Sequence, residues 1–231
     1  MPILTPTAAV GARSMPQAMT YVDPSRSMLP EESESFLAGT DLNGSFVADL
    51  LSDMLSHERC GAMLYRSVAE RTHNPVLQRQ YRTFGEETET HVEILEGLID
   101  GLGGDPLYVS PAARATEKSG MGLLESTFLM TGSVDLVTQE LVMLDAVLLA
   151  EAKDHANWSC LSALVDELPA GDVRAAFEGA VGQVEPQEDE HLAWAQDMRC
   201  RMVSLQAKSS AAQTLGARAE ELMARIKGML D

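Results

Sequence analysis

The sequence predicts an all-α protein whose long helices pack side by side as a bundle. Ala, Leu and Met are plentiful while aromatic residues make up only 5%, and this composition favours helices over strands. Apolar residues recur every three or four positions through four long segments, which is the period of an amphipathic helix. No run alternates apolar and polar residues over enough positions to predict a strand.

The first half of the chain is predicted to contain a flexible arm and two helices. Residues 1–43 are rich in Pro, Ser, Thr and Ala, which favours a flexible N-terminal arm. The first helix is expected over 44–72, where an Asn-Pro pair follows and stops it. The second is expected over 75–100, with Pro in its first turn and the glycines of GLGGDP (101–106) at its end.

The second half is predicted to repeat this pairing after a long connection over 107–132 that contains short helices. A third helix is expected over 133–167 and a fourth over 172–208, where Pro186 predicts either a kink or bulge or a break into two helices. Two helical pairs joined by a long crossover form a four-helix bundle of mixed direction. The expected organisation is an arm over 1–43, a bundle over 44–208 and a C-terminal helix within 209–231.

Charge and cysteine usage limit the partners and the compartment. The chain has 35 acidic against 17 basic residues, a net charge of −18, which disfavours nucleic acid and anionic membrane surfaces and attracts cations. Cys60, Cys160 and Cys200 are widely spaced and form no CxxC pair, which argues for a reducing compartment. With neither a secretory signal nor an apolar membrane span evident, we expect a cytoplasmic protein.

Polar residues interrupt the apolar stripe of every long helix near its middle. In chain order they are Glu58, Glu87, His91, Glu151, His155, Glu188 and His191. Burying a carboxylate costs several kcal/mol unless another charge compensates it, and no Arg or Lys occupies the stripes near these acids. The four glutamates carry a charge of −4, which two divalent cations would balance. Carboxylate and imidazole ligands together suit iron or manganese better than calcium or structural zinc.

In this pattern the chain resembles the ferritin-like superfamily of di-iron carboxylate proteins over about residues 44–208. The likeness rests on Glu58 in the first helix, EETETH (86–91) in the second, Glu151 in the third and EDEH (188–191) in the fourth. EDEH keeps the Glu-x-x-His spacing of the superfamily. The second helix departs from it, because Thr88 stands three residues before the histidine and the nearest inward glutamate stands four before it.

The two halves of the chain also share a spacing between an acid and an aromatic residue. Tyr65 follows Glu58 by seven residues, and Trp158 follows Glu151 by the same interval. The first of these separations is familiar in the first helix of ferritins. Since internal duplication is typical of the superfamily, the echo favours Glu151 over Glu140 as the ligand from the third helix.

The resemblance implies a ferritin-like four-helix bundle that binds two iron ions, with manganese as the alternative metal. Glu58 would be a terminal ligand, Glu151 terminal or bridging, and Glu87 and Glu188 bridging. His91 and His191 would be terminal nitrogen ligands, and His155 a ligand or a partner of one. Tyr65 would be a redox or hydrogen-bonding neighbour, and it is the candidate catalytic residue.

The implied function is an oxidoreductase or ferroxidase that reacts with dioxygen or peroxide, and the resemblance also implies a homodimer. Ferrous iron, hydrogen peroxide or an organic molecule could be the substrate. The alternative is a helical interaction module whose metal site is degenerate or absent. Thr88 favours that alternative, and the amphipathic C-terminal helix would offer its partner surface.

Overall fold

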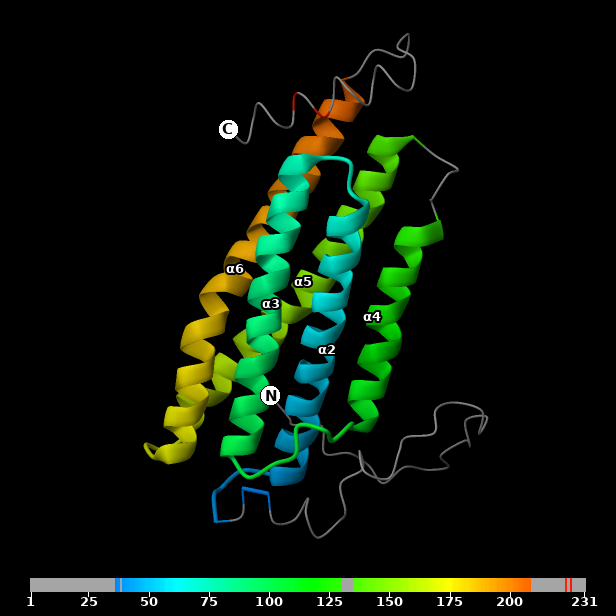
Figure 1. Ribbon diagram of the computed structural model, residues 1–231. Coiled ribbons are helices and arrows are strands. Elements are labelled where there is room, and N and C mark those ends of the chain that lie inside the picture. Colours follow the sequence, from blue (N-terminus) through cyan, green and yellow to red (C-terminus); the bar gives the residue numbers. More distant parts are fainter. Residues whose placement is uncertain (1–35, 38, 130–134, 209–222, 224, 226–231) are drawn as a thin grey trace, which may run out of the picture.

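The described part of the chain is entirely helical. The structure, a computed structural model, describes residues 36–37, 39–129, 135–208, 223 and 225 (Figure 1). Over these residues it contains no strand, and its helices are α2 (Gly44–Arg71), α3 (Pro75–Gly101), α4 (Pro111–Leu129), α5 (Leu136–Glu167) and α6 (Asp172–Ala207). The prediction of an all-α helical bundle is therefore confirmed for the described residues.

The four long helices lie within a few residues of their predicted bounds, and the connection between the pairs differs from its prediction. Residues 111–129 form one helix, α4, in place of short helices. Pro186 lies inside α6 without dividing it. The predicted C-terminal helix lies outside the described residues apart from Met223 and Arg225, and so does the N-terminal arm before Phe36. Phe36 itself is buried against the bundle.

Local sequence signals set the helix ends. Asn43, Asn74 and Asp135 are the N-caps of α2, α3 and α5, and each accepts a backbone N–H from the first turn of its helix. Pro75 occupies the first turn of α3, where its missing N–H costs nothing. Gly103, with a φ of +83°, lies just beyond the end of α3 in the left-handed conformation that glycine adopts readily.

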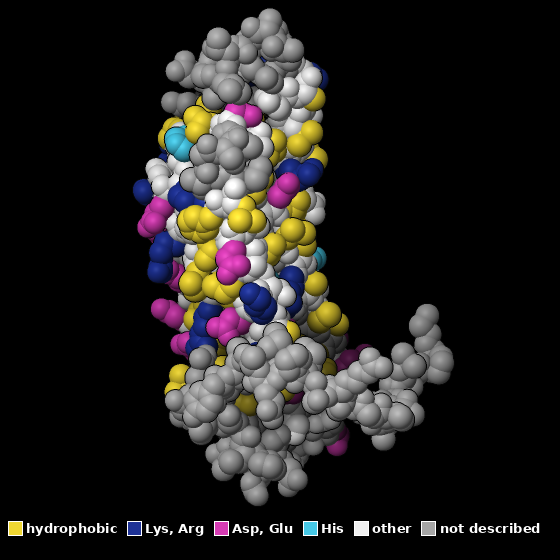
Figure 2. Space-filling model, turned by 90° about the vertical axis from the view of Figure 1, so that its right-hand side faces the viewer, with side chains coloured by type: hydrophobic (Ala, Val, Ile, Leu, Met, Phe, Trp, Pro, Cys, Tyr) yellow, Lys and Arg dark blue, Asp and Glu magenta, His cyan; other side chains and the backbone are white. Residues whose placement is uncertain are grey.

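The helices pack as a ring with one helix outside it. Neighbouring contacts run from α2 to α3, from α3 to α6, from α6 to α5 and from α5 back to α2. The crossover helix α4 packs on the outside against α2 and α5 (Figure 1). Figure 2, which faces the side on which α4 lies, shows hydrophobic side chains interspersed with Lys, Arg, Asp and Glu side chains over the described surface. None of the described helices combines the length and apolarity that crossing a membrane requires.

The core of the ring consists of two apolar clusters separated by a polar layer. One cluster includes Val68, Tyr81 and Met198, and the other includes Leu51 and Phe177. Each long helix contributes to both clusters and crosses the layer between them near its middle. Buried polar side chains in this layer come from all four helices of the ring. The polar residues that interrupt the sequence stripes thus meet at one level of the bundle.

Candidate metal centre

Five of the predicted ligand side chains meet in the polar layer, and each is at most 3% exposed. They are Glu58 on α2, His91 on α3, Glu151 on α5, and Glu188 and His191 on α6. They form two groups that share Glu188, and within each group the potential ligand atoms lie within 4.8 Å of one another. The sequence identified all five, and the structure brings them together.

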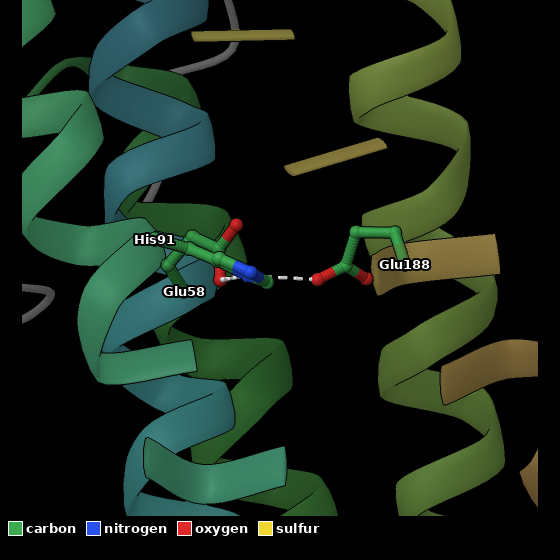
Figure 3. A group of neighbouring side chains, drawn as sticks. All are labelled: Glu58, His91 and Glu188. Carbon is green, nitrogen blue, oxygen red and sulfur yellow. Dashed lines mark ion pairs between the residues drawn. The ribbon is translucent and has the colours of Figure 1, made fainter. Parts of the chain in front are cut away.

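The first group places its histidine between two carboxylates. The Nδ1 atom of His91 lies 2.9 Å from Oε1 of Glu188 and 3.6 Å from Oε2 of Glu58. Figure 3 shows Glu58 and His91 extending from one side of the bundle and Glu188 from the opposite side, so that the three side chains converge between the helices. This convergence leaves both carboxylates within reach of one small cation.

The second group repeats this geometry on the other side of Glu188. The Nδ1 atom of His191 lies 3.5 Å from Oε2 of Glu151 and 3.6 Å from Oε1 of Glu188. Both histidines thus turn the same ring nitrogen toward the shared glutamate. Glu188 is therefore the one carboxylate placed to contact both groups.

Each outer glutamate is oriented by an aromatic donor from the opposite half of the chain. The indole N–H of Trp158 donates to Oε1 of Glu58 at 2.7 Å, and the hydroxyl of Tyr65 donates to Oε1 of Glu151 at 2.7 Å. The seven-residue echo in the sequence therefore corresponds to two equivalent hydrogen bonds. Both bonds use the outer oxygen and leave Oε2 of each glutamate facing the centre.

The outer nitrogens of the two histidines are held in the same paired way. Nε2 of His91 lies 2.7 Å from Oε1 of Gln187, and Nε2 of His191 lies 2.8 Å from Oε2 of Glu87. Since both partners are acceptors, each Nε2 carries a proton and donates it. A neutral ring then has a free lone pair on Nδ1, which is the atom facing the glutamates.

Six inward atoms of the centre have no hydrogen-bond partner outside the centre among the described residues. They are Glu58 Oε2, His91 Nδ1, Glu151 Oε2, both carboxylate oxygens of Glu188, and His191 Nδ1. Buried polar atoms without a partner are costly, and so many in one place need an explanation. Carboxylate oxygens and imidazole lone pairs are ligands for iron and manganese, so this set fits two such ions.

In the metal-free protein these groups compete for protons. Burial alone would lower the pKa of His91, but the adjacent carboxylates of Glu188 and Glu58 raise it to about 10. Burial raises the pKa of Glu188 to about 7 even though contact with His91 opposes this rise. In the metal-free protein His91 and Glu188 thus hold protons more tightly than usual, and bound metal ions would displace these protons.

Two predicted ligands lie outside both groups. Glu87 contacts His191 on its outer nitrogen, and its side chain is 32% exposed. His155 turns away to Asp189, with 2.9 Å between Nε2 and Oδ1, and its side chain is 35% exposed. Neither side chain shares a group with the five buried residues. The structure therefore places Glu87 as a hydrogen-bond partner of His191.

Thr88 stands on α3 at the position that Glu188 occupies on α6, three residues before the histidine. Its hydroxyl donates to the backbone carbonyl of Phe84 at 2.8 Å, and Thr88 contributes no carboxylate to the centre. The departure from Glu-x-x-His is therefore real in space as well as in sequence, and Glu87 does not replace the missing carboxylate from four residues back.

One buried acid of this layer was missed from the sequence. Asp154 on α5 is only 4% exposed, and its Oδ1 has no hydrogen-bond partner among the described residues. It follows Glu151 by three residues and precedes Trp158 by four, so the helical stripe itself contained the signal. Gln187 was missed too, because an amide next to Glu188 looks like a solvated side chain.

Glu140, the rejected alternative from the third helix, has another role. It accepts hydrogen bonds from the Thr72 hydroxyl at 2.8 and 2.7 Å and from the His73 backbone N–H at 2.7 Å. It thereby ties the turn between α2 and α3 to α5. This buried glutamate has its donors and lies outside both groups.

No protein-family model, no curated protein and no solved structure matches the chain.

Proposed function

We propose that the protein is a ferritin-like di-iron carboxylate oxidoreductase or ferroxidase. One ion would lie between Glu58, His91 and Glu188, and the second between Glu151, Glu188 and His191. The observation that carries the proposal is the orientation of the two histidines. Acceptors on their outer nitrogens turn both Nδ1 lone pairs toward carboxylate oxygens that have no other described partner.

The ligand types favour iron, with manganese as the alternative. Mixed carboxylate and imidazole sets suit both metals, and the strongly acidic chain would attract either cation. When bound, two such ions would supply the electrons that reduce dioxygen or peroxide. The residues of the chain hold the ligands in place and exclude bulk water from the layer through the apolar cluster on each side.

Tyr65 is our candidate for a residue that takes part in the reaction. Its hydroxyl donates to Glu151, and its ring lies 6.3 Å from that of His191 and 6.2 Å from that of Tyr81. Burial and the neighbouring Glu151 raise its pKa well above the usual value, so the phenol keeps its proton and remains a donor. We propose that it fixes Glu151 and exchanges an electron with the centre.

Metal analysis tests the proposal. Protein produced in iron-rich medium is expected to contain about two iron or manganese ions per chain, as the two groups imply, and the double variant Glu58→Ala, Glu188→Ala is expected to contain none. Equal, substoichiometric metal in both proteins would contradict the proposal. Titration with ferrous iron in air, with and without peroxide, then separates ferroxidase from peroxidase activity by the absorbance of ferric iron, and oxidation of an added organic compound would indicate an oxygenase.

The second candidate is a metal-free interaction module, and Thr88 is the observation that favours it. Under that hypothesis the melting temperature is the same with and without metal. A rise of several degrees on adding iron or manganese would exclude it, because a ligand that binds only the folded state stabilises that state. A homodimer and a cytoplasmic location complete the proposal, and both rest on the resemblance and the composition.

A further inference from the structure

The helix pair α2 and α3 differs from the corresponding pair α5 and α6 in the number of acids that it contributes to the layer. α2 and α5 correspond through Glu58 and Glu151, and three residues later α2 has Gly61 where α5 has Asp154. α3 and α6 correspond through their histidines, and three residues earlier α3 has Thr88 where α6 has Glu188. The pair α2 and α3 therefore has Gly61 and Thr88 at the two positions where the pair α5 and α6 has Asp154 and Glu188.

The small residues Gly61 on α2 and Thr88 on α3 face each other. A Cβ added at Gly61 would lie 3.4 Å from Cγ2 of Thr88, which is ordinary van der Waals contact. α2 and α3 thus approach closely at this level, and the two residues that face each other there are uncharged. At this position α3 offers the centre a hydroxyl and no carboxylate.

Asp154 is buried in the same layer, although it belongs to neither group, and no described Lys or Arg forms an ion pair with it. Lys153 next to it turns to Asp53, with 3.0 Å between Nζ and Oδ2. The basic group that contacts it is His57, whose Nε2 lies 4.0 Å from Oδ2 of Asp154 and 3.0 Å from the carbonyl oxygen of Ala150. Burial and Lys153 lower the pKa of His57, so this ring stays neutral and does not balance the aspartate.

We propose that Asp154 is the fourth carboxylate ligand of the dimetal centre and serves the ion held by Glu58, His91 and Glu188. This assignment rests on the proposed function. The Asp154 carboxyl group lies close enough to Glu58 for the two to share a hydrogen bond when one of them is protonated, which associates it with that ion. Four carboxylates then carry −4 against the +4 of two divalent ions, whereas the three glutamates alone leave one positive charge unbalanced.

Titration of the metal-free protein with ferrous iron under nitrogen tests the assignment. The wild type is expected to bind two ions per chain. Asp154→Asn is expected to keep one tight ion and to bind the second more weakly by about tenfold or more, since even partners of ligands contribute about 10- to 100-fold to affinity. Glu140→Gln is the matched control, because it neutralises an equally buried carboxylate outside the centre and should keep both ions.

The melting temperature of the metal-free protein provides the second measurement. Replacing an uncompensated buried carboxylate by an amide should leave that temperature unchanged or raise it. A loss of stability or a failure to fold in Asp154→Asn would show that the aspartate holds the fold through His57, and would overturn the assignment. Two ions bound with wild-type affinity by this variant would overturn it as well.

These outcomes separate the assignment from the proposed function. If the wild type binds no ion, the proposed function fails and the assignment with it. If the wild type and Asp154→Asn both bind two ions equally well, only the role of Asp154 is wrong.

Discussion

The half of the centre around His91 and the half around His191 have the same framework and different chemistry. In both, an aromatic donor holds the outer glutamate and an acceptor from a facing helix holds Nε2 of the histidine. That acceptor is neutral for His91, which contacts Gln187, and a glutamate for His191, which contacts Glu87. The aromatic donor is Trp158 in the first half and Tyr65 in the second.

This difference indicates which features position ligands and which tune them. The repeated features are orientation devices, since an indole and a phenol make hydrogen bonds of the same length to the two glutamates. The features that differ change the charge beside the two histidines. A carboxylate on Nε2 makes the imidazole a stronger donor than an amide does, so His191 should bind its ion more tightly than His91 binds its own.

Removing the shared glutamate should break both halves at once. We expect Glu188→Gln to lose both ions, because this carboxylate belongs to both groups. Without metal the same variant should melt at a higher temperature than the wild type, since burial raises the pKa of Glu188 and its ionised form is costly. Elemental analysis and thermal melting check this, with the exposed Glu190→Gln as control. One ion retained would show that the halves do not share a bridge.

Exchanging the residues that contact the two Nε2 atoms, Glu87 and Gln187, should exchange the metal affinities of the two halves. Glu87→Gln is expected to weaken binding at the His191 half by about 10- to 100-fold without removing the ion, and Gln187→Glu to strengthen the His91 half. Calorimetric titration of the two single variants and the double swap measures this. Complete loss of one ion in Glu87→Gln would instead support the sequence prediction that Glu87 is a ligand.

The pH dependence should distinguish the metal-free from the metal-loaded protein. The folded protein raises the pKa of Glu188 from 4.5 to about 7 and that of His91 from 6.5 to about 10. Both raised values stabilise the fold fully below the unfolded pKa, and this contribution is lost as the pH rises through the folded pKa. The melting temperature of the metal-free protein should therefore fall between about pH 5 and 10.

Metal should reverse that trend, because ions replace the protons and bind more tightly as the pH rises. His91→Gln removes the higher of the two titrations and should flatten the decline above about pH 7. An unchanged melting temperature across this range in the metal-free wild type would contradict the raised pKa values of Glu188 and His91.

The aromatic donors should have the smallest effect on metal content. Tyr65→Phe is expected to keep two ions while destabilising the protein by about 1–3 kcal/mol, since Oε1 of Glu151 loses its donor. If Tyr65 exchanges electrons with the centre, this variant should also oxidise ferrous iron more slowly in air. Trp158→Phe removes the equivalent donor and serves as the matched comparison. Equal rates in both variants would reduce Tyr65 to a positioning residue.

Much of the fold and most of the centre could be predicted from the sequence, because helical period and capping are local. The Asn-Pro pair indicated the end of α2 and the start of α3, and stepping along the stripes identified all five buried residues of the two groups. The single helix α4 was harder to predict, because few of its residues are buried and two of those, Thr116 and Thr127, are polar.

What could not be predicted depends on side-chain direction across helices. Glu87 and Thr88 are neighbours in sequence, and only the packing of α3 against α6 shows that the first reaches the outer side of His191. His155 lies on the same helix as Asp154, yet one turns to Asp189 and the other inward. Helical spacing alone does not show which of two adjacent residues points into the core.

The central claim is that two metal ions lie in the polar layer between the apolar clusters. Anomalous diffraction at the iron edge, from crystals of the protein loaded with ferrous iron, tests it most directly. We predict two peaks, one between Glu58, His91 and Glu188 and the other between Glu151, Glu188 and His191. No peak in this layer, with the same five side chains paired by protons alone, would contradict the account.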